Sequence, residues 1–151
     1  MRLQKDFRDL ERVDKELMYA KNHYILIGFI SEKYNDGVNV REYALWNEYG
    51  TLYIPARPFF RRATNTRKAK RLINNYAKRQ IGKVIDTRGH FTMEQAYNAI
   101  GVYVVGQIQK SIKRGNWQQN APSTVRRKGK SNPLIDSGSM INAVSFEIRR
   151  R

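Results

Sequence analysis

The sequence contains no cysteine, only two histidines and only four prolines among its 151 residues. Without cysteine the chain can form neither a disulfide framework nor a thiolate metal site, and thiol redox chemistry is excluded. The longest apolar run, "YILIGFI" at 24–30, is far too short to span a bilayer, and residues 1–17 contain no apolar signal region. We therefore expect a soluble, unexported protein that makes no membrane contact.

Groups that carry catalysis are scarce as well. His23 and His90 stand neither in a metal-ligand spacing nor beside a nucleophile and a carboxylate. The part of the chain after residue 48 contains only four carboxylates, too few for the clustered metal ligands of a nuclease. No glycine pattern that cradles phosphate occurs. The sequence thus predicts a protein that is not an enzyme, with no catalytic residues, no metal and no cofactor.

Positive charge is abundant, and it is unevenly distributed. The net charge is +16, yet residues 1–48 hold 8 basic and 9 acidic side chains, whereas residues 49–151 hold 21 basic and 4 acidic ones. Such an asymmetry favours contact with a polyanion, most often nucleic acid. No helix-turn-helix or zinc-finger spacing is present, so any DNA contact should be salt-sensitive and independent of base sequence.

The first third of the chain predicts a helix followed by a hairpin. Apolar residues recur every three or four positions over 2–21, the period of an amphipathic helix with one buried stripe. This stripe consists of Leu3, Phe7, Leu10, Val13, Leu17 and Ala20. The run 24–30 reads as a buried strand, "NDG" at 35–37 as a turn and "VNV" at 38–40 as a second strand.

The middle of the chain predicts two helices joined by a stiff connection. A short helix over 42–49 ends at Gly50, which can adopt the left-handed conformation that closes a helix. Pro55 and Pro58 fix φ, so the residues after Gly50 are extended, and a helix over 58–85 follows. That helix has one apolar face and one cationic face, and it contains no acidic residue.

The last third predicts a helix, a loop and a closing strand. Thr92 and Gln95 form a capping-box pattern that begins a helix extending to 114. Residues 115–133 are rich in glycine, proline, asparagine and positive charge, and we expect a long exposed basic loop with one helical turn. A turn at "DSG", a short apolar helix and a strand at 144–148 complete the hairpin's sheet. The predicted fold is a single α+β domain over 1–151, a small antiparallel sheet packed with long amphipathic helices.

Two stretches resemble a known family. "NEYGTLYIPARPFFRRA" at 47–63 and "APSTVRRKGKSNPLIDSGSMINAVSFEI" at 121–148 resemble the tail-completion, or neck, proteins of long-tailed bacteriophages, the minor-tail-protein-Z-like and virion-morphogenesis families. The matching positions are Tyr49, Gly50, Thr51, Ile54, Pro55, Ala56, Arg57, Pro58 and Phe59, together with Leu134, Ile135, Asp136, Ser137 and Gly138. These positions, Leu134 and Ile135 apart, are the candidate subunit or partner interface.

The resemblance implies a structural protein of the virion rather than an enzyme. It implies a hexameric ring at the head-proximal end of the tail, formed in the host cytoplasm during assembly and retained in the neck. The ring would contact the tail terminator on one side and the head connector or adaptor proteins on the other. Genomic DNA would pass through its lumen and make non-specific contacts.

Two hypotheses about residues follow. The first is that Arg57, held between two prolines, faces an adjacent subunit or the terminator, so that its removal would prevent assembly and spare the fold. The second is that a cationic surface faces DNA phosphates in the lumen. Its residues are Arg61, Arg67, Lys68, Arg71, Lys78, Arg79, Arg126, Arg127 and Lys128. A head-tail adaptor or tail terminator, a free sequence-independent DNA-binding protein and a metal nuclease remain the alternatives.

Overall fold

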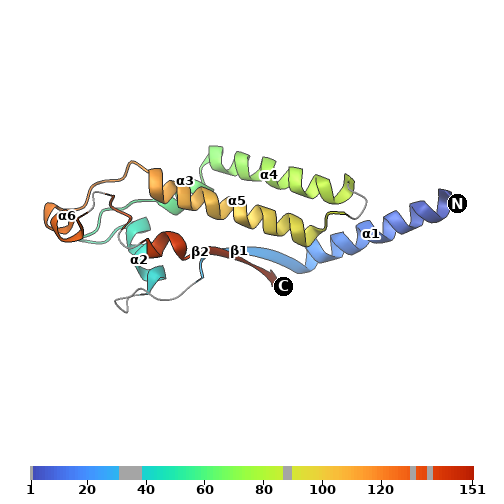
Figure 1. Ribbon diagram of the computed structural model, residues 1–151, viewed down its shortest axis with the longest axis horizontal. Coiled ribbons are helices and arrows are strands. Elements are labelled where there is room, and N and C mark those ends of the chain that lie inside the picture. Colours follow the sequence, from blue (N-terminus) through green and yellow to red (C-terminus); the bar gives the residue numbers. More distant parts are fainter. Residues whose placement is uncertain (1, 31–38, 87–89, 130–131, 136–137) are drawn as a thin grey trace.

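The structure is a computed structural model that describes residues 2–30, 39–86, 90–129, 132–135 and 138–151, with the backbone alone for 2–6 and 127–128. Its elements are α1 (Arg2–Asn22), β1 (His23–Phe29), α2 (Val40–Tyr49), α3 (Phe59–Thr64), α4 (Arg67–Asp86), α5 (Met93–Arg114), α6 (Pro122–Lys128), α7 (Ser139–Asn142) and β2 (Val144–Arg150). The molecule is elongated: α4 and α5 lie side by side along its length, α1 projects from one end and α6 lies at the other (Figure 1). The predicted α+β domain is confirmed.

The two strands form an antiparallel sheet with each other. Their register runs from His23 opposite Arg150 to Phe29 opposite Val144. The prediction of a closing strand at 144–148 is therefore confirmed, but the prediction of a hairpin over 24–40 is wrong. The second hairpin strand was expected at 38–40, where Val40 instead begins α2 and Asn39 caps it by accepting a 2.9 Å hydrogen bond from the Arg41 backbone N–H. The predicted "NDG" turn lies outside the described residues.

The predicted helix over 58–85 is two helices. α3 ends at Thr64, and α4 begins at Arg67. Thr66 explains the break, because its hydroxyl oxygen accepts a 3.2 Å hydrogen bond from the Ala69 backbone N–H, as an N-cap residue does. The N-cap at Thr66 thus begins a new helix, although the spacing of the apolar residues continues without a break.

The start of α5 and the end of α2 follow the sequence prediction. Thr92 and Gln95 form the reciprocal capping box, each side chain accepting a hydrogen bond from the other's backbone N–H. Gly50 has a φ of 81° and donates its backbone N–H to the Trp46 carbonyl at 2.8 Å, although its ψ of 166° is not that of the left-handed helix. A Cβ at Gly50 would come within 3.0 Å of the Ala56 nitrogen, so both conformation and space require glycine here.

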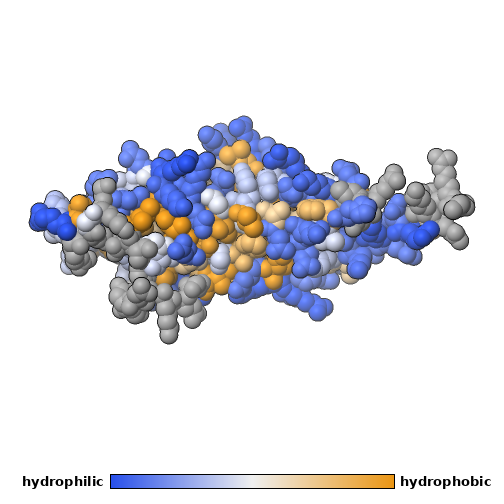
Figure 2. Space-filling view, viewed as in Figure 1, coloured by the Kyte–Doolittle hydropathy of each residue, from blue (hydrophilic) through white to orange (hydrophobic). Residues whose placement is uncertain are grey.

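The main hydrophobic core is organised by α5. Its buried residues Ile100, Val104, Ile108 and Ile112 line one face, and α3, α4, β1 and β2 pack against this helix. Around them lie Ala44, Phe59, Ala63, Trp117, Leu134, Met140, Ile141 and Val144. Figure 2 shows hydrophobic residues gathered in the middle of the molecule and hydrophilic ones along the α4 edge.

The region 115–133 is more structured than the long exposed loop that we predicted. Pro122 occupies the first turn of α6, which spans seven residues and ends at Gly129 with a φ of 63°. Trp117 is buried in the core. The segment is therefore anchored at its start by an aromatic side chain and carries a short helix at its outer end (Figure 1).

Helix α1 forms as predicted, but the described part of its apolar stripe is only partly buried. Phe7 and Leu10 are each 65% exposed, and Leu17 is exposed too. The contact of α1 with the body is small and mixed. Tyr19 and Ala20 pack against the buried cluster of Val84, Met93 and Ala96. Polar contacts lie beside them: Arg12 donates to the Val84 carbonyl at 2.9 Å, and a Glu16 carboxylate oxygen accepts from the Met93 backbone N–H at 2.6 Å. Of the predicted stripe, Val13 and Ala20 are half-buried, whereas Phe7, Leu10 and Leu17 face solvent.

Candidate functional site

Arg57 lies at the centre of the first signature motif and points into the protein. Its side chain is 2% exposed. Its guanidinium donates to the Asn47 side-chain oxygen at 2.9 Å, to the Gln118 carbonyl at 2.9 Å and to the Asn120 side-chain oxygen at 2.8 Å. Burial lowers the pKa of Arg57, an effect that the nearby Tyr43 partly opposes. An arginine remains charged despite such a shift, so these are charge-assisted hydrogen bonds.

This geometry corrects the first residue hypothesis. Arg57 does not face an adjacent subunit or a terminator, because its donors are occupied by α2 and by the segment after α5. The prolines on either side hold the backbone extended, and the Arg57 backbone N–H also donates to the Asn47 carbonyl at 2.6 Å. The residue joins the connection to two other parts of the chain, which is a structural role.

The other signature positions divide between core and surface. Phe59 is buried, Gly50, Ile54, Pro55 and Pro58 are half-buried, and Tyr49, Thr51 and Ala56 are exposed. In the second motif Leu134 is buried, Ile135 is half-buried, and Gly138 has a φ of 85° at the N-cap of α7. The predicted interface residues Asp136 and Ser137 lie outside the described residues.

The turn within the first motif presents two apolar side chains that sequence reasoning missed. Leu52 is 89% exposed and Tyr53 is 91% exposed. The turn beneath them is ordered by hydrogen bonds: the Thr51 backbone N–H donates to the Ile54 carbonyl at 2.8 Å, and the Thr51 hydroxyl oxygen accepts from the Ile54 backbone N–H at 3.0 Å. The signal was present in the sequence, since a large aliphatic and an aromatic residue rarely occupy a glycine-led turn without a covering surface.

Arg61 was predicted to face DNA, but an acidic side chain holds it. Glu48 is buried, and one of its carboxylate oxygens lies 2.9 Å from the Arg61 Nε. The same carboxylate accepts the backbone N–H groups of Phe60 at 2.8 Å and Arg61 at 3.0 Å, at the start of α3. Because Glu48 neutralises it, Arg61 does not belong to a free cationic surface. The pairing acid comes from α2, outside the acid-free segment that the prediction considered.

The remaining predicted DNA-facing residues form two separate sets. Those on α4 are all exposed: Arg67, Lys68, Arg71, Lys78 and Arg79. We call these five residues the α4 cationic face. Arg126, Arg127 and Lys128 belong to α6, at the end of the molecule that is remote from most of α4 (Figure 1). Of their side chains only that of Arg126 is described, and it is exposed. The structure does not bring the two sets together.

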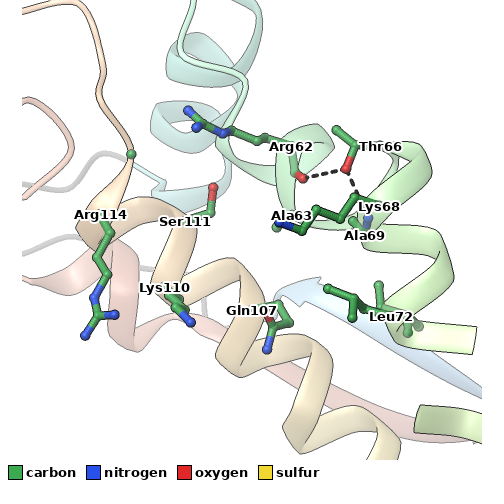
Figure 3. Close-up of a pocket in the computed structure, with 12 residues that line it drawn as sticks. Arg62, Ala63, Thr66, Lys68, Ala69, Leu72, Gln107, Lys110, Ser111 and Arg114 are labelled. Carbon is green, nitrogen blue, oxygen red and sulfur yellow. Dashed lines mark hydrogen bonds between the residues drawn. The ribbon is translucent and has the colours of Figure 1, made fainter. Parts of the chain in front are cut away.

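A groove lies where α3 and the first turns of α4 meet the last turns of α5. It encloses about 220 Å³, and Figure 3 shows its lining residues. They are Arg62, Ala63, Thr66, Lys68, Ala69, Leu72, Ile73, Gln107, Lys110, Ser111, Arg114 and Gly115. The floor is apolar, the charged lining residues are all basic, and the Ser111 hydroxyl is a buried group with no hydrogen-bond partner among the described residues. We call this feature the α4–α5 groove.

The described part of the chain contains no group of three histidine, aspartate or glutamate side chains placed to hold a metal ion. Within the same residues, no helix is both long enough and apolar enough to cross a membrane. Comparison with protein families, with curated proteins and with solved structures found no match to this chain. Function must therefore be argued from the surfaces described above.

Proposed function

We propose that this chain is a structural subunit of a long-tailed bacteriophage virion that completes the tail at its head-proximal end. In this role it would form a hexameric ring that contacts the tail terminator and the head connector or adaptor proteins. The specific role rests on the resemblance of the two motifs. The general role, a subunit that other proteins cover, rests on surfaces of this molecule.

The observation that carries the proposal is the exposed turn at Leu52 and Tyr53. Both side chains lie almost fully in solvent, while Arg57 and Gly50 fix the backbone on either side of the turn. Because the backbone of this turn is already held, covering it orders only the side chains and costs less than ordering a mobile loop, so the turn suits assembly. In this motif Arg57 and Phe59 are buried and stabilise the fold, whereas Leu52 and Tyr53 are exposed and suit contact with a partner protein.

The α4 cationic face supports a DNA path beside the subunit. The five residues of the α4 cationic face, together with exposed Lys70 and Lys83, lie on a helix whose only acidic residue is its last, Asp86. Unbalanced positive charge repels itself unless a polyanion lies near it. A lumen that holds DNA would supply that polyanion without base-specific contacts. The same observation favours the second candidate, a free sequence-independent DNA-binding protein.

Electron microscopy of lysates tests the assembly role directly. A phage that carries this gene with a stop codon at Trp46 should accumulate filled heads beside separate tails of normal length. Growth in a host that suppresses the stop codon is the control and should restore joined particles. Joined, intact particles without suppression would contradict the proposal and leave the DNA-binding alternative.

A further inference from the structure

Helix α1 has an apolar face that the rest of the described chain leaves uncovered. Phe7, Leu10, Leu17 and Met18 are all exposed and fall within an arc of about 100° around the helix. The exposed carboxylates Glu11 and Asp14 lie in or beside that arc, and the exposed Lys21 falls within it at the C-terminal end of the helix. A helix face that is apolar and carries acids is unusual in this chain, because residues 49–151 contain only four acidic side chains.

The α4–α5 groove has the complementary character. Its floor is formed by small and apolar side chains from α3 and α4, and exposed Lys110 and Arg114 lie along its α5 side (Figure 3). At about 220 Å³ it is smaller than the pockets that bury a small-molecule ligand, which span roughly 300–1,000 Å³, and it is open to solvent along the helices, so side chains that protrude from another helix could enter it. The unpartnered Ser111 hydroxyl adds a polar group that an occupant could satisfy.

The groove cannot be filled by α1 of the same chain. Arg12 and Glu16 attach α1 to Val84 near the end of α4 and to Met93 at the start of α5. The groove lies at the opposite ends of those two helices, and α4, with 20 residues, is about 30 Å long. Figure 1 shows α1 continuing away from the helical layer rather than back along it.

We propose that α1 of one copy docks in the α4–α5 groove of a second copy. Phe7, Leu10 and Leu17 would contact the apolar floor, while Glu11 and Asp14 would lie near Lys110 and Arg114. Because the two surfaces are different and lie far apart in one chain, the contact is heterologous, and repetition of such a contact closes a ring or extends a filament. The inference deepens the proposed function by naming the contact between ring subunits, and it rests on that function only for the closure of the ring.

Disulfide trapping tests this contact in purified protein, since the chain has no cysteine of its own. Two single variants are mixed under oxidising conditions, one with Leu10→Cys on α1 and the other with Leu72→Cys in the groove. Both positions are exposed in the single chain, so the substitutions should leave the fold intact. We expect a covalent dimer that contains one copy of each variant. The matched control mixes Leu10→Cys with Val102→Cys, an exposed position on α5 outside the groove, and should yield several-fold less dimer.

Charge reversal separates docking from random collision. Adding Glu11→Lys and Asp14→Lys to the α1 variant should reduce the yield of dimer several-fold, and adding Lys110→Glu and Arg114→Glu to the groove variant should restore it. Equal yields from groove and control positions would overturn the proposal. So would a Leu10→Cys homodimer that forms in preference to the mixed dimer, or protection of Leu72→Cys from thiol labelling by duplex DNA without any cross-link. None of these results depends on the phage role, which the stop-codon experiment tests separately.

Discussion

At the scale of single residues, Arg57 is the side chain on which the connection between α2 and α3 depends. Three of its nitrogens donate to oxygens of Asn47, Gln118 and Asn120, and the last two lie 61 and 63 residues away in the sequence. An arginine between two prolines can be recognised in the sequence, but partners at that separation cannot. The extended backbone was predictable from φ restriction, whereas the direction of the side chain depends on a segment that folds against it from elsewhere.

Replacement of Arg57 by alanine should therefore destabilise the fold rather than only impair assembly. It leaves the buried Asn47 side-chain oxygen without this donor, at a cost of about 1–3 kcal/mol, and removes the part-buried hydrogen bonds to Gln118 and Asn120 as well. We expect a loss of about 3 kcal/mol in the free energy of unfolding, measured by urea denaturation. Arg57→Lys should also destabilise the protein, because an ammonium group cannot reproduce the planar fork of donors. Unchanged stability of Arg57→Ala would show that the three hydrogen bonds contribute nothing.

At the scale of elements, the sequence predicted helices and strands better than it predicted their partners. The capping box at Thr92 and Gln95 and the helix end at Gly50 are local signals, and both hold in the structure. The hairpin prediction was wrong because β1 pairs with β2, a strand at the far end of the chain. No local sequence pattern specifies such a long-range contact. The prediction that the apolar stripe of α1 is buried was inaccurate for a related reason. Periodicity identifies an apolar face, but it does not tell whether the same chain covers that face.

The contact between α5 and β2 gives a prediction with its own control. At Gly101 a Cβ would collide with the Phe146 ring, whereas at Gly106 in the same helix it would meet nothing within 4 Å. Gly101→Ala should lower the free energy of unfolding by about 1–3 kcal/mol through overpacking. Gly106→Ala should raise it by about 0.5–1 kcal/mol, because alanine favours the helix. Urea denaturation of both variants measures the difference, and a Gly101→Ala protein as stable as Gly106→Ala would refute this account of the packing.

At the scale of the whole molecule, charge and shape divide the surface into distinct regions. The N-terminal helix presents an apolar face with acids, α4 presents exposed cations, and the turn at Leu52 and Tyr53 projects from the connection between α2 and α3. The sequence places 21 basic residues after residue 48, and in the structure seven of them lie on α4, three on α6 and the others elsewhere in the chain. The structure also removes Arg61 from the predicted DNA-facing set through its ion pair with Glu48.

The α4 cationic face should bind duplex DNA through its phosphates. Replacement of Arg67, Lys68, Arg71 and Lys78 by glutamine should weaken binding at low salt and reduce the slope of log K against log salt by about 0.9 for each phosphate that the protein no longer neutralises. Because all four side chains are exposed, the free energy of unfolding should stay within about 0.5 kcal/mol. The matched control changes four exposed cations away from α4, namely Lys15, Lys21, Arg150 and Arg151, and so removes the same net charge. Equal loss of affinity in the two variants would mean that net charge alone, rather than this face, attracts DNA.

The pairing of β1 with β2 also bears on how quickly the protein folds and how long it stays folded. Phe29 lies opposite Val144, so closing the sheet brings together strands between which all the helices from α2 to α7 occur. Such a closure carries a large loop entropy, and proteins rich in long-range contacts fold slowly. We therefore expect the strand pairing to slow folding if it forms in the rate-limiting step, and to act mainly on the unfolding rate if it forms afterwards. The folding and unfolding rates of a variant weakened at the strand pair distinguish these two cases.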